Sequence, residues 1–382
     1  MGSGPSSEAL PPFRPPSPAR LLSLDALRGL TVAAMVLVNN PGTWRAIYPP
    51  LRHADWHGWT LTDLVFPFFV FIVGVAVPVA LGPRVERSGR AWTMARVLRR
   101  SAVIFGLGIV LNGLPTFDWA TLRVPGVLQR IAVCYLVAAV LFLVTGWRTQ
   151  ALVAAGLLLG YWLVMTVVPV PGYGAGDLSK AGNLAAYLDR TILGSPHLWQ
   201  AARVYDPEGI LSTAPAVATA LLGVLAGHWL RKGHAPGATA ARLALAGIAC
   251  AGFGQIWSVW FPVNKALWTS SYAMLTGGLA LIALAACYWL IEVQGHRRWA
   301  IPFASLGVNA LALFFLSTLV ARLLILIRVG AERASLHALV FDRVFAPWAS
   351  PIDASLAYAI AYVLVWSALM WVLYRENIQL RV

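Results

Sequence analysis

The stretch LTDLVFPFFVFIVGVAVPVAL, from Leu61 to Leu81, decides the fold class of this chain. Its last 18 residues, from Leu64 onward, carry no charged side chain. A helix needs about 20 predominantly apolar residues to cross the hydrocarbon core of a bilayer. The stretch therefore predicts a transmembrane helix.

Similar apolar runs occur along most of the chain, of which 59% is hydrophobic and only 12% is charged. This composition excludes an average soluble domain and is typical of membrane proteins with several spans. We predict an all-α, polytopic transmembrane helical bundle of about ten spans. Besides Leu61 to Leu81, the predicted spans are Leu24 to Asn40, Arg99 to Gly113, Pro125 to Thr145, Ala151 to Val168, Ile210 to Leu230, Arg242 to Trp260, Trp268 to Ile291, Ile301 to Ile327 and Ala354 to Tyr374.

The lysines and arginines indicate which loops face the cytoplasm, because basic residues in short loops are retained there. One set of connections is strongly basic and includes the run from Arg84 to Arg100, whereas basic and acidic residues nearly balance in the opposite set. Both termini are therefore predicted to be cytoplasmic, and the loop that holds His53 is predicted to lie outside. The same distribution accounts for most of the formal net charge of +14, so we expect no nucleic-acid partner.

The chain divides into a tail and one membrane domain. Residues 1–20 are rich in Pro, Ser and Gly and lack a helical period, which predicts a disordered cytoplasmic tail. Residues 21–382 are predicted to form the membrane domain, in which the long outer connection 169–209 is expected to fold as a cap. Cys134, Cys250 and Cys287 all fall inside predicted spans, so no disulfide framework is expected.

Polar, titratable side chains gather between the first two spans, in the segment from Leu51 to Thr60. His53 titrates near neutral pH and can act as a general base. Asn39, at the end of the first span, can donate a hydrogen bond to a developing negative charge or can simply cap its helix. Thr60-Leu61-Thr62-Asp63 has the spacing of a capping box, so Asp63 can cap the second span, orient His53, or do both.

Other polar residues have a structural and a functional interpretation. His57 lies near His53 and Asp55, but no third ligand stands at a suitable spacing, so we expect no metal site. Asp206-Pro207 matches an N-cap followed by proline, which predicts that Asp206 caps a helix. Polar groups within spans or beside outer loops are candidates for substrate binding. These candidates are Asn40, His57, Gln129, Arg130, Glu208, Asn264 and Lys265.

Ordered motifs extend from Ser23 to about Asn309. They are SLDALRG from Ser23, VNN from Val38, RHADW from Arg52, DLVFPFF from Asp63, PGVLQR from Pro125, DPEGIL from Asp206 and PVNK from Pro262. Together they resemble the heparan-alpha-glucosaminide N-acetyltransferase family of transmembrane acyltransferases.

The resemblance implies transfer of an acetyl group from cytosolic acetyl-CoA to the amino group of a terminal glucosamine on the far side of the membrane. It also implies that the family's active histidine is His53 and that the asparagine closing its first span is Asn39. Set against the lysosomal enzyme, we expect no N-terminal lumenal domain in this protein, and His57 stands where that enzyme has an amide. We therefore expect a shorter form of the family, with an amino-sugar or glycan acceptor.

The predicted catalytic residues are thus His53, Asn39 and Asp63. Arginine suits recognition of the anionic head of acetyl-CoA, the expected acyl donor. The candidates for this role are Arg28, Arg84, Arg96, Arg99 and Arg100. We expect an integral protein of a bacterial inner membrane that contacts lipids, and we leave a homodimer open. Two alternatives stay open as well: a transporter or flippase, and an acyltransferase for another cell-envelope glycan.

Overall fold

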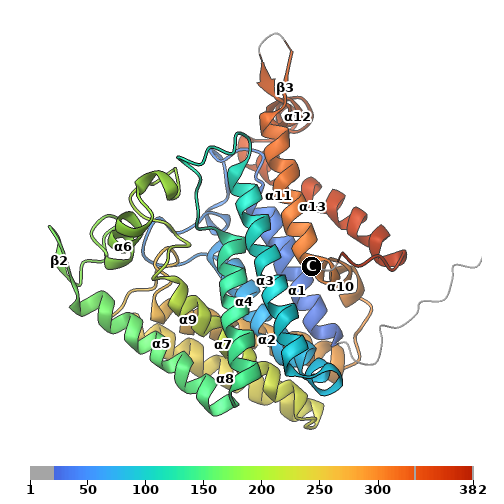
Figure 1. Ribbon diagram of the computed structural model, residues 1–382. Helices are drawn as coiled ribbons and strands as arrows, with labels where there is room; N and C mark the ends of the chain where they lie inside the picture. The colour runs from blue at the N-terminus through green and yellow to red at the C-terminus, as the bar shows by residue number, and fades with distance from the viewer. Residues whose placement is uncertain (1–20, 331–332, 381–382) are drawn as a thin grey trace, which may run out of the picture.

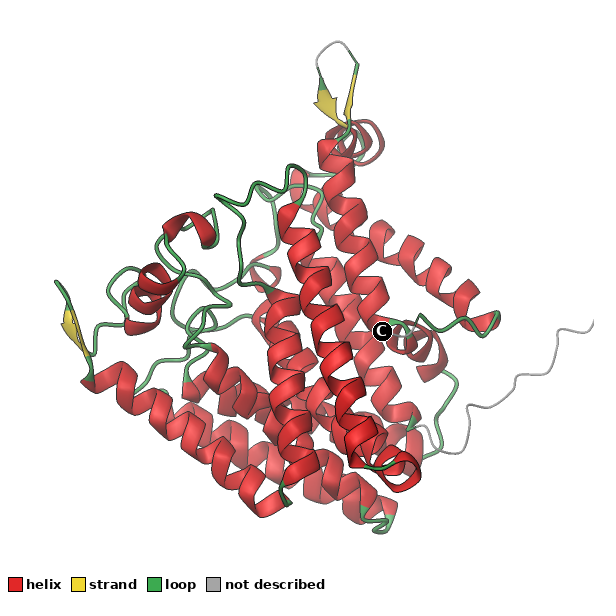
Figure 2. Ribbon diagram, in the orientation of Figure 1, coloured by secondary structure: helices red, strands yellow, loops and turns green. Residues whose placement is uncertain are grey.

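The computed structural model describes residues 21–330 and 333–380, so the predicted tail, 1–20, lies outside the described residues. Helices make up nearly all of the regular structure (Figure 2). They are α1 (Leu22–Asn39), α2 (Leu61–Ser88), α3 (Arg90–Gly113), α4 (Val127–Val144), α5 (Trp147–Val167), α6 (Leu184–Ile192), α7 (Thr213–Arg231), α8 (Pro236–Trp257), α9 (Ser270–Tyr288), α10 (Ala300–Val308), α11 (Ala310–Leu326), α12 (Leu336–Val340) and α13 (Pro351–Arg375). Short 3-10 turns, η1 (Pro49–Leu51) and η2 (Ser195–His197), and π-helical turns, η3 (Trp289–Val293) and η4 (Phe341–Phe345), complete the helical elements of the described residues.

The predicted helical bundle is confirmed, since every predicted span coincides with a helix or a helix pair. Within the described residues, eight helices are long and apolar enough to cross a membrane, or nine spans when the bent pair α10–α11 is included. The tenth predicted span corresponds to α3, which is not among these nine. Its first half carries Arg96, Arg99 and Arg100, and charged side chains make a segment costly to bury in lipid.

The prediction of one continuous span from Ile301 to Ile327 is wrong. The chain bends by 76° between α10 and α11, at Asn309. The Asn309 side chain donates to the carbonyl of Ile378 at 3.1 Å and accepts from the backbone N–H of Leu380 at 2.9 Å. The bend is therefore supported by hydrogen bonds to a segment about 70 residues away, which the uniformly apolar pattern cannot reveal.

Three helix pairs form the densest packing: α2 with α7, α8 with α9, and α1 with α10. The α2–α7 pair approaches closely because Gly74 and Gly223 face the partner backbone. A Cβ on Gly74 would lie 1.9 Å from the carbonyl oxygen of Ala220, and one on Gly223 would lie 2.1 Å from that of Phe71. Small residues allow this approach between membrane helices, where van der Waals packing replaces the hydrophobic effect as the main attraction. The pair thereby holds the start of α2 in place for the candidate site.

We call the end of the bundle where α2, α4 and α7 begin the His53 end, and the end where they finish the Arg231 end. At the His53 end, the segment 169–209 contains the antiparallel strands β1 (Pro169–Val170) and β2 (Gly174–Ala175), then α6 and η2. Figure 1 shows α6 and β2 standing beyond the end of α5. This segment contacts the His53 loop, because the indole of Trp56 donates to the carbonyl of Leu178 at 2.8 Å. A second hairpin, β3 (Arg328–Val329) with β4 (Ala334–Ser335), follows α11.

Candidate active site at the His53 end

Asp63 organises the start of α2. One carboxylate oxygen accepts the backbone N–H of Thr60 and that of Ala54, each at 3.0 Å, and the other lies 2.7 Å from Nδ1 of His53. The Asp63 side chain is 1% exposed, whereas the His53 side chain is 45% exposed. The capping box expected from the sequence is present. Asp63 therefore combines both roles that its position suggested, capping the helix and holding the imidazole.

Lys265 is the third member of this cluster. Its Nζ lies 2.9 Å from Nδ1 of His53 and 3.4 Å from the Asp63 oxygen that faces the ring. The Nδ1 atom cannot donate to the carboxylate and accept from the ammonium at the same time. Since a bare nitrogen lone pair would repel the carboxylate at 2.7 Å, the proton belongs on Nδ1. In the tautomer with this proton, the lone pair is on Nε2, and the Nζ of Lys265 lies 3.4 Å from that atom.

The loop that carries Lys265 is positioned by its own buried polar residues. Asn264 is fully buried, and its side-chain oxygen accepts the backbone N–H of Leu267 at 2.9 Å. The carbonyl of Val263 accepts the N–H of Gly58 at 2.8 Å, which joins this loop to the His53 loop. Burial lowers the pKa of Lys265, while the charges of Asp63 and Glu208 act in the opposite direction. Asn264 is thus a support for the site rather than a free donor.

The two asparagines at the end of α1 differ. Asn40 donates its amide to the carbonyl of Val36 at 2.7 Å, so it satisfies the end of its own helix. Asn39 is exposed on the last turn, and within the described residues its side chain makes no hydrogen bond. His57 is also largely exposed, at 3.5 Å from the Asn264 amide, and burial of part of its ring lowers its pKa. Of the two asparagines, Asn39 is the one whose amide stays available to a ligand.

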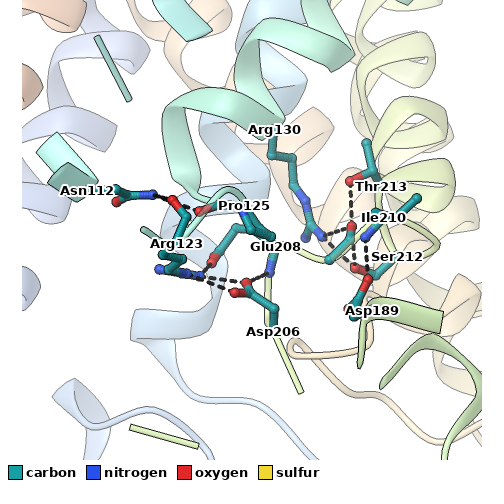
Figure 3. Close-up of polar contacts among 11 residues, drawn as sticks. Asn112, Arg123, Pro125, Arg130, Asp189, Asp206, Glu208, Ile210, Ser212 and Thr213 are labelled. Carbon is teal, nitrogen blue, oxygen red and sulfur yellow. Dashed lines mark hydrogen bonds and ion pairs between the residues drawn. The ribbon is translucent and has the colours of Figure 1, made fainter. Parts of the chain in front are cut away.

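Arg123, Asp206 and Glu208 form an ion cluster (Figure 3), and Glu208 is near enough for its charge to act on Lys265. Arg123 donates to both oxygens of Asp206, at 2.8 and 2.6 Å, and to Glu208 at 2.5 Å. The prediction that Asp206 caps a helix is wrong, because α7 begins only at Thr213 and the Asp206 carboxylate is taken by Arg123. Burial lowers the pKa of Arg123, but the hydrogen bonds and charges of the two carboxylates outweigh it and raise the pKa. Glu208, predicted to bind substrate, is likewise engaged by Arg123.

Arg130 points from α4 toward the start of α7 (Figure 3). Its Nη2 donates to the carbonyl of Gly209 at 3.2 Å and to the hydroxyl of Ser212 at 2.5 Å. Its Nε and Nη1, and the Nε2 of the neighbouring Gln129, are buried and have no hydrogen-bond partner within the described residues. Asp189 of α6 also lies against Gly209. Arg130 of α4 and Asp189 of the segment 169–209 therefore both contact the backbone turn at Gly209. Burial raises the pKa of Asp189 to about 6.

The arginines predicted to bind the cofactor are not equivalent. Arg28 pairs with Asp25 at 2.9 Å, and Arg96 lies over the ring of Trp92. Arg84 has interactions of its own, and Arg99 is exposed. Arg100 lies 5.0 Å from the ring of Tyr135, and its Nε is buried without a hydrogen-bond partner within the described residues. Of the five, Arg100 is the one whose unpaired donor faces the interior of the bundle.

A cavity of about 170 Å³ lies at the Arg231 end. Arg90 and Arg231 line it, together with Gly82, Val85, Glu86, Phe142 and Leu143. Arg231 pairs with Glu86 at 2.8 Å. Arg90 and Arg231 are not among the cofactor contacts predicted from the sequence. They come together only because α2, α3, α4 and α7 pack against one another at this end.

The sequence also did not identify Arg123 or Asp189 as parts of the site. Both are ordinary loop or short-helix residues in the sequence, and their partners lie 83 and 21 residues away. The one available signal was the pair of acids in Asp206-Pro207-Glu208, because buried carboxylates need a basic partner. Among the described residues, no group of three or more His, Cys, Asp or Glu side chains is arranged to hold a metal ion.

Comparison with known proteins agrees with these motifs. A sequence model described as "Heparan-alpha-glucosaminide N-acetyltransferase, catalytic" matches residues 20–255, which include His53, Asp63, Arg130 and the Arg123 ion cluster but not Lys265. The heparan-alpha-glucosaminide N-acetyltransferase of Homo sapiens is 30% identical over 424 aligned positions, covering 94% of this chain and 60% of the human protein. That of Mus musculus is 30% identical over 368 positions, covering 81% of this chain and 55% of the mouse protein.

The chain thus spans less than two thirds of the length of these relatives. The match nevertheless runs through more than half of the chain and includes the His53 and Asp63 motifs. On these grounds the chain belongs to the heparan-alpha-glucosaminide N-acetyltransferase family.

Proposed function

We propose that the protein is a transmembrane N-acetyltransferase that moves an acetyl group from acetyl-CoA to the amino group of a glucosamine-type sugar. The observation that carries the proposal is the His53–Asp63 pair at 2.7 Å, in which the exposed imidazole is held by a buried carboxylate and its Nε2 has the Nζ of Lys265 3.4 Å away. The human and mouse relatives are named for this transfer to a glucosaminide. Family membership and a base at the end of the bundle support the same chemistry.

In the proposed reaction, the acceptor nitrogen attacks the thioester carbonyl, and a C–N bond forms as the C–S bond breaks. Nε2 of His53 accepts the proton from the nitrogen and returns it to the departing thiolate. Asp63 keeps Nδ1 protonated and orients the ring. The exposed amide of Asn39 donates to the carbonyl oxygen as it gains negative charge. A route through an acetyl-histidine intermediate is chemically open as well.

The depth of the bundle limits where the cofactor can lie. From Asp63 to Glu86 is 23 residues of α2, or about 35 Å at a rise of 1.5 Å per residue. The pantetheine arm is about as long as five extended residues, roughly 18 Å. For direct transfer, the phosphates must therefore enter the bundle well beyond the cavity at Arg231. Arg100 lies at that depth, since its partner Tyr135 stands halfway along α4, and we assign it the phosphate contact.

The rest of the proposal follows the predicted topology. The Arg231 end faces the cytoplasm, where the acyl donor enters, and the His53 end faces the outside of a bacterial inner membrane. The acceptor then meets Lys265, Arg130 and Gln129 around His53, beneath the segment 169–209. An acyltransferase that modifies another cell-envelope glycan uses the same residues and differs in the acceptor alone.

The test supplies acetyl-CoA and glucosamine to the purified protein in lipid and measures CoA release and product mass. Wild type, His53→Ala and the control His296→Ala, an exposed histidine at the other end, are compared. Acetylated glucosamine from wild type and control, with a loss of about 100-fold or more in His53→Ala, supports the proposal. If the folded protein acetylates neither glucosamine nor a panel of envelope amino sugars, the proposal fails and transport without covalent change becomes the better account.

A further inference from the structure

Two tryptophans at the Arg231 end are surrounded by basic side chains that the proposed function does not use. Lys232 lies 5.9 Å from the ring of Trp147 and 5.3 Å from that of Trp229. Arg242 lies 5.1 Å from the ring of Trp229, and Arg148 lies 5.5 Å from that of Trp147. These five residues, which we call the cation–indole cluster, come from the start of α5, the end of α7 and the first turns of α8.

The positive charge of the cluster is not neutralised by the protein. No ion pair involves Arg148, Lys232 or Arg242 in the described part of the chain. All three side chains are exposed. In addition, the indole N–H of Trp229 is buried and has no hydrogen-bond acceptor among the described residues. The cluster thus offers three exposed cations, which together fit an anionic group rich in acceptor oxygens.

The helices below the cluster expose an apolar surface. Leu152 follows Arg148 by one turn of α5 and is 73% exposed, and Leu245 follows Arg242 by one turn of α8 and is 66% exposed. Residues three or four apart lie on the same face of a helix. The cations therefore stand directly above apolar side chains of the kind that face acyl chains. A soluble phosphate matches only the charged part of this surface, whereas a phospholipid matches both parts.

We propose that the cation–indole cluster binds the head group of an anionic phospholipid, with the acyl chains along Leu152 and Leu245. The phosphate lies between Lys232 and Arg242, beside the ring of Trp229. Tryptophan is common at the boundary between lipid and water, and a basic residue near an anionic leaflet contributes about 1 kcal/mol of attraction. This site lies at the opposite end from His53 and does not depend on the proposed reaction.

The test titrates the full chain, purified in a neutral detergent, with phosphatidylglycerol and follows the melting temperature. At about 1 kcal/mol for each cation, Lys232→Gln with Arg242→Gln should raise the half-saturating lipid concentration about 30-fold. The matched control is Arg297→Gln with Arg298→Gln, which removes the same charge from exposed arginines in the loop between η3 and α10. Equal melting temperatures without added lipid show that the variants are folded.

Phosphatidylcholine and glycerol 3-phosphate serve as the other two ligands. We expect phosphatidylglycerol alone to stabilise the wild type and the control, at similar concentrations. The proposal is overturned if both double variants weaken the response equally, since a general charge effect then explains it. Stabilisation by phosphatidylcholine to the same degree also overturns it. An equal response to glycerol 3-phosphate points instead to a site for a free anion.

Discussion

Lys265 and His53, which are 212 residues apart in the sequence, bring Nζ and Nδ1 to within 2.9 Å of each other. Both groups face the same oxygen of Asp63, at 3.4 and 2.7 Å. The buried Asp63 carboxylate thus positions both the imidazole and the ammonium at the His53 end.

Replacing Lys265 by Gln should lower kcat/KM for acetyl transfer by about tenfold or more, because the ammonium that contacts both the His53 ring and the buried Asp63 carboxylate is removed. The measurement is kcat/KM of the protein in lipid near neutral pH. Lys265→Arg keeps a positive charge and should retain more of the activity. A wild-type kcat/KM in Lys265→Gln would contradict a role for Lys265 in the site.

Asp63→Asn should lower the acetyl-transfer rate by about 100-fold or more, because an amide no longer favours the tautomer with a proton on Nδ1. The amide oxygen can still accept the backbone hydrogen bonds at the start of α2, so the melting temperature should change little. Asp55→Asn is the matched control, since Asp55 is 94% exposed and pairs with the loop residue Lys180. Rates close to wild type in both variants would contradict a role for Asp63 in the reaction.

Arg123→Gln should lower the free energy of unfolding by about 3 to 5 kcal/mol, since it leaves the fully buried Asp206 carboxylate without its cation. The double variant Arg123→Gln with Asp206→Asn should recover much of this loss. Apparent stabilities of the four proteins in the cycle, measured by thermal unfolding in one detergent, give the coupling. Simple additivity of the two single effects would show that the pair does not act as a unit.

Gly209→Ala should destabilise the contact between α6 and the bundle. A Cβ at this position would lie 1.9 Å from a carboxylate oxygen of Asp189, so α6 must shift or the turn must move away from Arg130. Overpacking of this kind costs about 1 to 3 kcal/mol. The measurement is the rate of limited proteolysis within 169–209. Gly160→Ala on α5 is the control, because nothing lies within 4 Å of its added Cβ, and an equal rate in both variants would refute the expectation.

Asp189 gives the stability a defined pH dependence. Its pKa is raised from 3.8 to about 6, so the folded state binds more protons than the unfolded state between these values. The stability that this carboxyl contributes is therefore complete below about pH 4 and is lost as the pH rises through 6. Relative to wild type, Asp189→Asn should be more stable at pH 7 than at pH 4.5, by about 2 kcal/mol between these two pH values. Melting temperatures at the two pH values test this, with Asp55→Asn as the exposed control.

The fold class and the local parts of the site follow from the sequence alone. A run such as Leu64 to Leu81 has few alternatives to a membrane helix, because every backbone polar group must be bonded within the segment once water is absent. The capping box of Thr60 and Asp63 is equally local, and both residues are found where their spacing places them. The side-chain type and the family motifs predict His53 as the base, and the expected contact with Asp63 is present.

The tertiary structure decided what depends on distant partners. The bend at Asn309 is stabilised by a hydrogen bond to the backbone of Ile378, near the C-terminus. Glu208 forms an ion pair with Arg123, which lies 85 residues away. Lys265 becomes a neighbour of His53 only because the loops before α2 and α9 dock on each other. Hydropathy and residue spacing report only on interactions between residues that lie within a few helical turns of each other. Ion pairs and hydrogen bonds between segments depend on the packing of whole helices, and no local pattern in the chain encodes that information.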